Sequence, residues 1–63
     1  MLFKSVSELE VGEMFPGEHS VFIIIAIDTL SYAPANTILF HCLFNGSVIK
    51  KFFDTDERVW VLN

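Results

Sequence analysis

The sequence predicts an all-β fold, and three features support this prediction. Residues 21–27 form an unbroken apolar run in which five of seven residues are Val or Ile, the β-branched types that suit a strand better than a helix. The run is far shorter than the ~20 residues that a membrane-spanning helix needs. Asn45-Gly46 separates two further apolar segments, which is typical of a two-residue hairpin because both turn positions require positive φ.

Length and cysteine content predict a single domain, residues 1–63, that needs extra stabilisation. A chain of this size buries only ~60% of the surface that it exposes when unfolded. Its one cysteine cannot form an intramolecular disulfide, whereas small secreted proteins usually contain several. Residues 1–4 lack the pattern of a signal peptide. We therefore expect a cytoplasmic protein with no membrane segment.

Composition and charge narrow the function classes. Hydrophobic residues make up 52% of the chain and charged residues 19%, which disfavours disorder and favours additional buried surface. Oligomerisation would supply the stabilisation that a small core lacks. Eight acidic residues against four basic ones give a net charge of −4. Nucleic acid is therefore disfavoured as a partner, since phosphate-binding surfaces are usually basic.

The first third of the chain predicts one helical turn and one short strand. Ser5 and Glu8 match a capping box, which favours a turn over about residues 6–10 that ends before Gly12. An irregular lead-in is the alternative. Residues 13–15 follow as a short strand. Four glutamates make this third acidic, and whether it forms a binding face stays open: Glu8, Glu10, Glu13 and Glu18.

The central strand is expected over about residues 19–28, after a turn at Pro16-Gly17 in which glycine provides the freedom to reverse. Alternate side chains of a strand point to opposite faces. A uniform β-branched stripe is expected to face the core: Val21, Ile23, Ile25 and Ile27. The opposite face should meet water, yet it is also apolar, which indicates that a partner covers it: Phe22, Ile24 and Ala26.

A loop over residues 29–35, with Tyr32 and Pro34, leads into a hairpin whose strands flank Asn45-Gly46. The two-residue turn predicts a register in which Phe44 faces Ser47 and each further pair follows in step. One hairpin face is expected to be core, interrupted by Ser47 and Lys51: Ile38, Phe40, Cys42, Phe44, Ile49 and Phe53. The other face is interrupted by His41 and Lys50: Leu39, Leu43, Val48 and Phe52.

A polar turn at residues 54–57 precedes a last short strand at 58–62, with Val59 and Val61 on one face and Trp60 on the other. Five sequential antiparallel strands in a chain this short close most easily into a small, strongly bent barrel. The predicted fold is thus a five-stranded antiparallel SH3-like barrel with one short N-terminal helical turn. A barrel of the OB type is the second choice, because it usually needs more residues.

The first half of the chain carries a resemblance to known proteins. Its motif is Ser5-Val6-Ser7-Glu8-Leu9-Glu10-Val11-Gly12-Glu13-Met14-Phe15, followed by a Gly turn and a Val/Ile strand. It resembles the start of the KOW-type, SH3-like domain of the bacterial elongation factor P family, and also a set of small phage-encoded proteins. The resemblance implies an SH3-like fold and a phage or bacterial source. The family's domain presents a basic hairpin tip to RNA, whereas the tip here is Asn45-Gly46.

Side chains that could carry chemistry are few. His41 and Cys42 point to opposite faces of one strand, so they cannot share a metal ion with His19 in a regular site of three or four ligands. Asp54 and Asp56 are typical turn residues, and no nucleophile or phosphate-loop motif occurs. Side chains should also fill the interior of so small a barrel and leave no pocket. We therefore expect a protein that is not an enzyme and uses no metal or cofactor.

The function that the sequence favours is protein–protein contact, with the chain itself, with a host protein, or with both. Aromatic residues with few charges are typical of interface centres. The predicted interface consists of the second apolar face: Phe22, Ile24, Ala26, Leu39, Leu43, Val48, Phe52 and Trp60.

Two alternatives remain open. One is a nucleic-acid-binding module of the KOW or OB type that uses stacking and phosphate contacts, with the candidate residues Lys50, Lys51, Arg58 and Trp60. The other is an oligomer that holds a small anionic ligand where its subunits meet.

Overall fold

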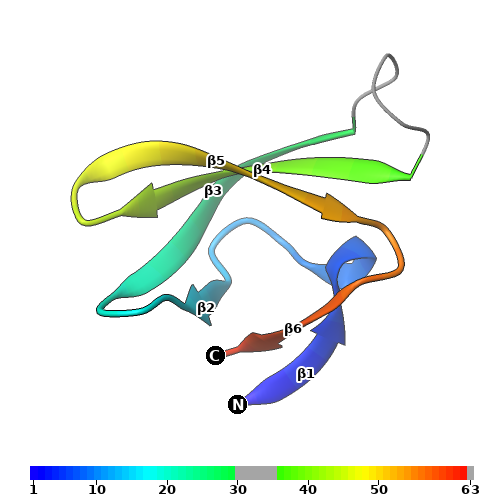
Figure 1. Cartoon of the computed structure of the whole chain (residues 1–63), viewed down its shortest axis with the longest axis horizontal. Helices are drawn as coiled ribbons and strands as arrows, with labels where there is room; N and C mark the ends of the chain where they lie inside the picture. Colours follow the sequence, from blue (N-terminus) through cyan, green and yellow to red (C-terminus); the bar gives the residue numbers. More distant parts are fainter. Residues whose placement is uncertain (30–35, 63) are drawn as a thin grey trace.

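The computed structural model describes residues 1–29 and 36–62, which form six strands and one 3-10 turn (Figure 1). The all-β class is therefore confirmed. The expected loop with Tyr32 and Pro34 lies outside the described residues. The elements are β1 Leu2–Ser5, η1 Val6–Glu8, β2 Met14–Pro16, β3 Val21–Thr29, β4 Thr37–Phe44, β5 Ser47–Asp54 and β6 Arg58–Val61.

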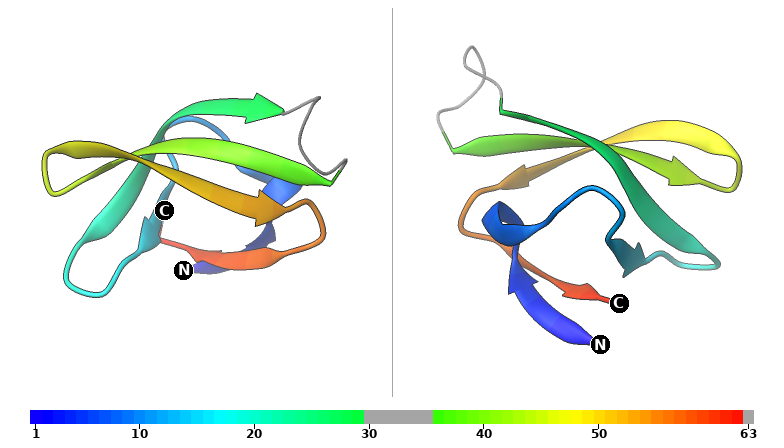
Figure 2. Two further views of the ribbon diagram at one scale, coloured as in Figure 1. Left: turned by 45° about the horizontal axis from the view of Figure 1, so that its top comes forward. Right: turned by 180° about the vertical axis from the view of Figure 1, so that it is seen from behind.

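The strands pair antiparallel in two sheets, β2-β3-β4-β5 and β1-β6, instead of in one closed five-stranded barrel. Figure 2 shows the two sheets on opposite sides of the molecule, with the two chain ends side by side. The sequence prediction missed β1 because this strand spans only Leu2–Ser5 and its partner β6 lies at the far end of the chain. Pairing of such distant segments leaves no local signal.

Three contacts hold the small sheet against the large one. The Leu62 amide donates to the Met14 carbonyl oxygen at 2.8 Å, so the end of β6 reaches β2. The Lys4 ammonium on β1 donates to the Glu13 carboxylate beside β2, at 2.9 Å to Oε2 and 3.2 Å to Oε1. Val6 and Leu9, on and after η1, are buried in the core between the sheets.

The β4–β5 hairpin has the register that its turn predicts. Asn45 and Gly46 have φ of 50° and 79°, the positive values that a type I′ turn requires. Phe44 pairs with Ser47, and the ladder continues in step to Thr37 with Asp54. The predicted core face of this hairpin is confirmed, since Ile38, Phe40 and Cys42 are buried and Phe44, Ile49 and Phe53 pack against the core.

The prediction for the faces of β3 is wrong over its first half. Phe22 and Ile24 are buried in the core, whereas Ile25, expected inside, is exposed. A β-bulge lies between Ile24 and Ala26, so that Ile24 pairs with Cys42 and Ala26 with His41. One extra residue reverses the direction of every later side chain. The partly buried Ile27 therefore also packs against the core.

Acid is expected to weaken the fold through Glu13. Hydrogen bonding to Lys4, and then to the Glu10 amide, lowers the pKa of Glu13 below its ordinary value of 4.5, with burial opposing. A carboxylate with a lowered folded pKa contributes stability that is present above pH 4.5 and is lost as pH falls through the folded value. Glu13→Gln should therefore lower stability near neutral pH and flatten its loss in acid. Urea unfolding at about pH 7 and about pH 3 measures both effects.

The same change at exposed Glu18 is the matched control. A Glu13→Gln variant that loses stability in acid as steeply as the parent would show that the Lys4 contact contributes nothing.

Candidate binding surfaces

The eight residues of the predicted interface do not lie on one surface. Ile24 is in the core, which corrects its assignment to an outer face. Phe22 is also a core residue, and together with Trp60 it lines a pocket instead. The other five lie on the outer side of the four-stranded sheet, on β3, β4 and β5: Ala26, Leu39, Leu43, Val48 and Phe52. Of these, Leu39 is only 6% exposed, which corrects its assignment to an open interface.

The outer face consists of three rows that cross the strands. Cross-strand partners define these rows. The apolar row is Ile23–Leu43–Val48, and the largely polar row is Ala26–His41–Lys50. The third row, Asp28–Leu39–Phe52, ends in a carboxylate. His41 Nε2 lies 2.8 Å from Asp28 Oδ2, which joins the last two rows. Three large apolar side chains are open to solvent here: Leu43 at 36%, Val48 at 61% and Phe52 at 58%.

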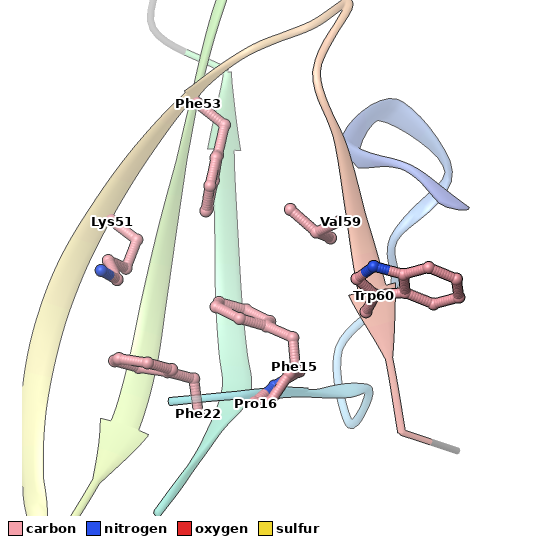
Figure 3. A pocket seen from close by; sticks show the side chains of 7 residues that line it. All are labelled: Phe15, Pro16, Phe22, Lys51, Phe53, Val59 and Trp60. Atoms are coloured by element: carbon pink, nitrogen blue, oxygen red, sulfur yellow. The ribbon is translucent and has the colours of Figure 1, made fainter. Parts of the chain in front are cut away.

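A pocket of about 340 Å³ opens between β5 and β6, where the two sheets form no ladder (Figure 3). The expectation that side chains fill the interior is thus wrong at this position. A closed barrel would join these strands, whereas here β5 is the last strand of its sheet. The pocket is lined by Phe15, Pro16, Phe22, Lys51, Phe53, Val59 and Trp60.

Stacked aromatic rings form the pocket wall. The Phe22 ring stacks on Phe15 at 5.1 Å and on Phe44 at 4.3 Å between centroids. Phe53 meets Phe15 edge-on at 6.0 Å. Across the opening, Trp60 packs on Phe3 at 4.9 Å, and both remain half exposed. Rings held by neighbours on both sides cannot turn aside, so the wall has a fixed shape.

Lys51 places one positive charge at this wall. Its Nζ lies 4.7 Å from the centroid of the Phe22 ring, within the range of a cation–π contact. The ion pairs within residues 1–29 and 36–62 are Lys4–Glu13, Glu18–His19 and Asp28–His41. Lys51 therefore has no carboxylate partner in the described part of the chain. It is also the one ionisable side chain among the described residues that line the pocket.

Sequence reasoning did not find this pocket, although Lys51 supplied a signal. A lysine in the middle of an otherwise apolar core face marks a position where that face is not fully covered. The remaining lining residues look like ordinary core or turn residues in the sequence. Trp60 borders the pocket because β6 pairs with β1 and its end is hydrogen-bonded to Met14 on β2.

The residues proposed for nucleic acid do not form one groove. Lys50 and Lys51 point to opposite faces of β5, since only Lys51 reaches the pocket. Arg58 is exposed on β6, and Trp60 follows it at the pocket. Of the four, only Lys51 and Trp60 border the pocket, and Figure 3 shows the Trp60 indole directed away from Lys51.

Cys42 and His41 are not among the residues that line the pocket. Cys42 is fully buried, and burial raises the pKa of its thiol, although the charge of Lys51 opposes this. His41 and Cys42 lie on opposite faces, as predicted. Within the described residues, no three His, Cys, Asp or Glu side chains are grouped as metal ligands would be. Acidic residues of the first third are mostly exposed, except Glu13, which is paired with Lys4.

No helix in the described ranges has the length and apolar character to cross a membrane. Comparisons with protein-family models, with curated proteins and with solved structures found no match to this chain.

Proposed function

We propose that this chain is a non-enzymatic protein-interaction module that self-associates through the outer face of its four-stranded sheet. The observation that carries the proposal is the exposure of Leu43, Val48 and Phe52 on adjoining strands of one hairpin. Large apolar side chains gathered on one face mark sites of protein contact. Covering them together with Ile25 would remove on the order of 300 Å² of apolar surface per copy, or about 7 kcal/mol before the cost of association.

The charges of this face suit a second copy. Lys50 on β5 and Asp28 on β3 lie on opposite sides of β4. A two-fold axis parallel to β4 lays β3 of one copy over β5 of the other. Each row then lies over the same row of the second copy, so Asp28 of one copy and Lys50 of the other lie one row apart, within reach of the long lysine side chain, and the pair occurs twice.

Phe52→Glu is expected to separate the copies while leaving the fold intact, because this side chain is already open to solvent. We expect the parent chain to have the mass of a dimer or larger assembly, and the variant to need at least tenfold more protein to assemble, a change of about 1.4 kcal/mol. Light scattering on a sizing column, repeated over a range of concentrations, measures this.

Trp60→Ser is the matched control, since Trp60 is 51% exposed but belongs to the other sheet. It should leave the assembly unchanged. A parent chain that stays monomeric at about 0.5 mM, a concentration at which millimolar affinities already show, contradicts self-association.

Other expectations stay predictions beside this proposal. They are the SH3-like relationship, the bacterial or phage source, the cytoplasmic setting, and the binding of a small anionic ligand between subunits. Nucleic-acid binding has weaker support, because Lys50 and Lys51 point to opposite faces of β5 and cannot track one phosphate backbone.

A further inference from the structure

We propose that the free edge of β5 and the pocket beside it bind an extended segment of another protein, in which an acidic side chain and a large apolar side chain are separated by one residue. The inference rests on the proposed function in one respect, that the chain works by contact with proteins. It uses a different surface from the self-association face, so the two can fail separately.

The edge of β5 offers backbone groups to an added strand. In a hairpin with a two-residue type I′ turn, the pair that flanks the turn, here Phe44–Ser47, is bonded through its backbone, and every second pair after it. The amides and carbonyls of Val48, Lys50 and Phe52 therefore point away from β4. The next in this series, the Asp54 amide, donates to Glu57 Oε2 at 3.1 Å, which confirms the direction.

No strand of the described chain pairs with this edge, since β5 ends the order β2-β3-β4-β5. Unpaired strand edges are templates for an additional strand, and peptide recognition by strand addition uses them. A segment bound here would form main-chain hydrogen bonds with Val48, Lys50 and Phe52.

Strand addition also determines which side chains enter the pocket. Residues directly opposite each other in neighbouring strands point to the same face. Of the β5 residues, Lys51 and Phe53 line the pocket, so the residues opposite these two would point into it. The position opposite Lys51 favours a carboxylate, because this ammonium has no carboxylate partner among the described residues. The position opposite Phe53 faces the aromatic wall and favours a large apolar side chain.

The pocket volume fits this occupant. A volume of about 340 Å³ is at the low end of the ~300–1,000 Å³ that ligand pockets span. It accommodates the side chains of a short peptide stretch. Because Lys51 and Phe53 of β5 line the pocket, a segment whose backbone pairs with the β5 edge would direct alternate side chains into it.

A second copy of this chain does not suit the same edge. Two β5 strands related by a two-fold axis overlap most in two registers, which place either Lys50 or Lys51 directly opposite its own copy. Like charges in directly opposite positions destabilise a strand pair, and edge lysines are a known protection against pairing between identical strands. The charge of this edge therefore selects a partner that carries acidic residues.

The experiment uses two synthetic extended peptides rich in Val and Thr, one with Phe-Thr-Glu at its centre and one with Glu-Thr-Phe, because an added strand can run in either direction. Trp60 is the only tryptophan of the chain and borders the pocket, so its emission gives a second signal beside the affinity measurement. Anisotropy of a dye on the peptide measures affinity. We expect one peptide order to bind and to change the Trp60 emission.

Lys51→Glu should weaken this binding at least tenfold, and a peptide with Lys in place of Glu should recover it. Lys51→Met removes the charge while keeping much of the apolar stem, and should weaken binding without the recovery. Lys50→Glu, on the opposite face of the same strand, is the matched control and should change affinity less than threefold. The inference is overturned if neither peptide binds at up to about 1 mM. It is also overturned if Lys50→Glu weakens binding as much as Lys51→Glu does.

Leu43→Glu separates this inference from the proposed function, because Leu43 lies on the self-association face of β4 and lines neither the free edge of β5 nor the pocket. Loss of assembly with retained peptide binding supports both. A parent chain that is monomeric but binds the peptide overturns only self-association, and an assembling chain that binds neither peptide overturns only this inference.

Discussion

Replacing Ile24 by lysine is expected to unfold the chain, and not merely to separate its copies. Ile24 is 0% exposed and packs in the core between the two sheets. Loss of a buried aliphatic side chain alone costs about 2–5 kcal/mol, and an unpaired ammonium in an apolar core adds to this. Small domains have a total stability of about 5–15 kcal/mol, so the variant should show no cooperative urea transition.

Ile25→Lys is the control for this substitution, because Ile25 is the next residue, lies at the bulge and is 42% exposed. Its lysine can reach water, so we expect a change below about 1 kcal/mol. Circular dichroism during urea unfolding measures both variants. A folded Ile24→Lys variant beside an unfolded Ile25→Lys variant would mean that β3 presents the opposite face to the core.

Gly17→Ala is expected to destabilise the chain by about 1–3 kcal/mol, the usual cost of overpacking. A Cβ atom at this position would lie 2.7 Å from a Phe22 ring carbon and 2.8 Å from a Phe44 ring carbon. These rings stack on each other at 4.3 Å, and Phe15 lies behind Phe22. Glycine is therefore needed here for close approach. The sequence indicated a different reason for glycine at position 17, namely the backbone freedom of a Pro16-Gly17 turn.

A double-mutant cycle tests this reason. Phe44→Leu removes one of the two rings that a new Cβ would strike and lets the other, Phe22, shift toward the space left by its stacking partner. Gly17→Ala should therefore cost at least about 1 kcal/mol less in that background than in the parent chain. Urea unfolding of the four chains measures the coupling. Equal costs in both backgrounds would exclude Phe44 as the source of the strain and leave the Phe22 ring or the backbone turn, where the Gly17 amide donates to the Ser20 carbonyl oxygen.

The binding surfaces were only partly accessible from the sequence. The outer residues of the hairpin follow from the register of its turn, so Leu43, Val48 and Phe52 were assigned correctly to one face. The pocket was missed because its walls come from β2, β3, β5 and β6, and only Lys51 interrupts an apolar pattern there. Its existence depends on the absence of a β5–β6 ladder, which no short segment encodes.

The sequence by itself determined what depends on neighbouring residues. Asn45-Gly46 specifies its turn through the positive φ of two adjacent positions, and the hairpin register follows from that turn. The turn after Ser5 is likewise local, since the Ser5 hydroxyl accepts a hydrogen bond from the Ser7 amide at 3.4 Å. Such features need no contact with distant parts of the chain.

Only the tertiary structure decided which face of β3 is buried and where the sheets stay apart. Both faces of residues 21–27 are apolar, so hydrophobicity alone does not select one. The choice comes from ring stacking of Phe22 with Phe15 and Phe44, and from a bulge that lets Ile27 also reach the core. The pairing of β1 with β6 joins the two ends of the chain. It leaves the edge of β5 free, and with it the proposed peptide site.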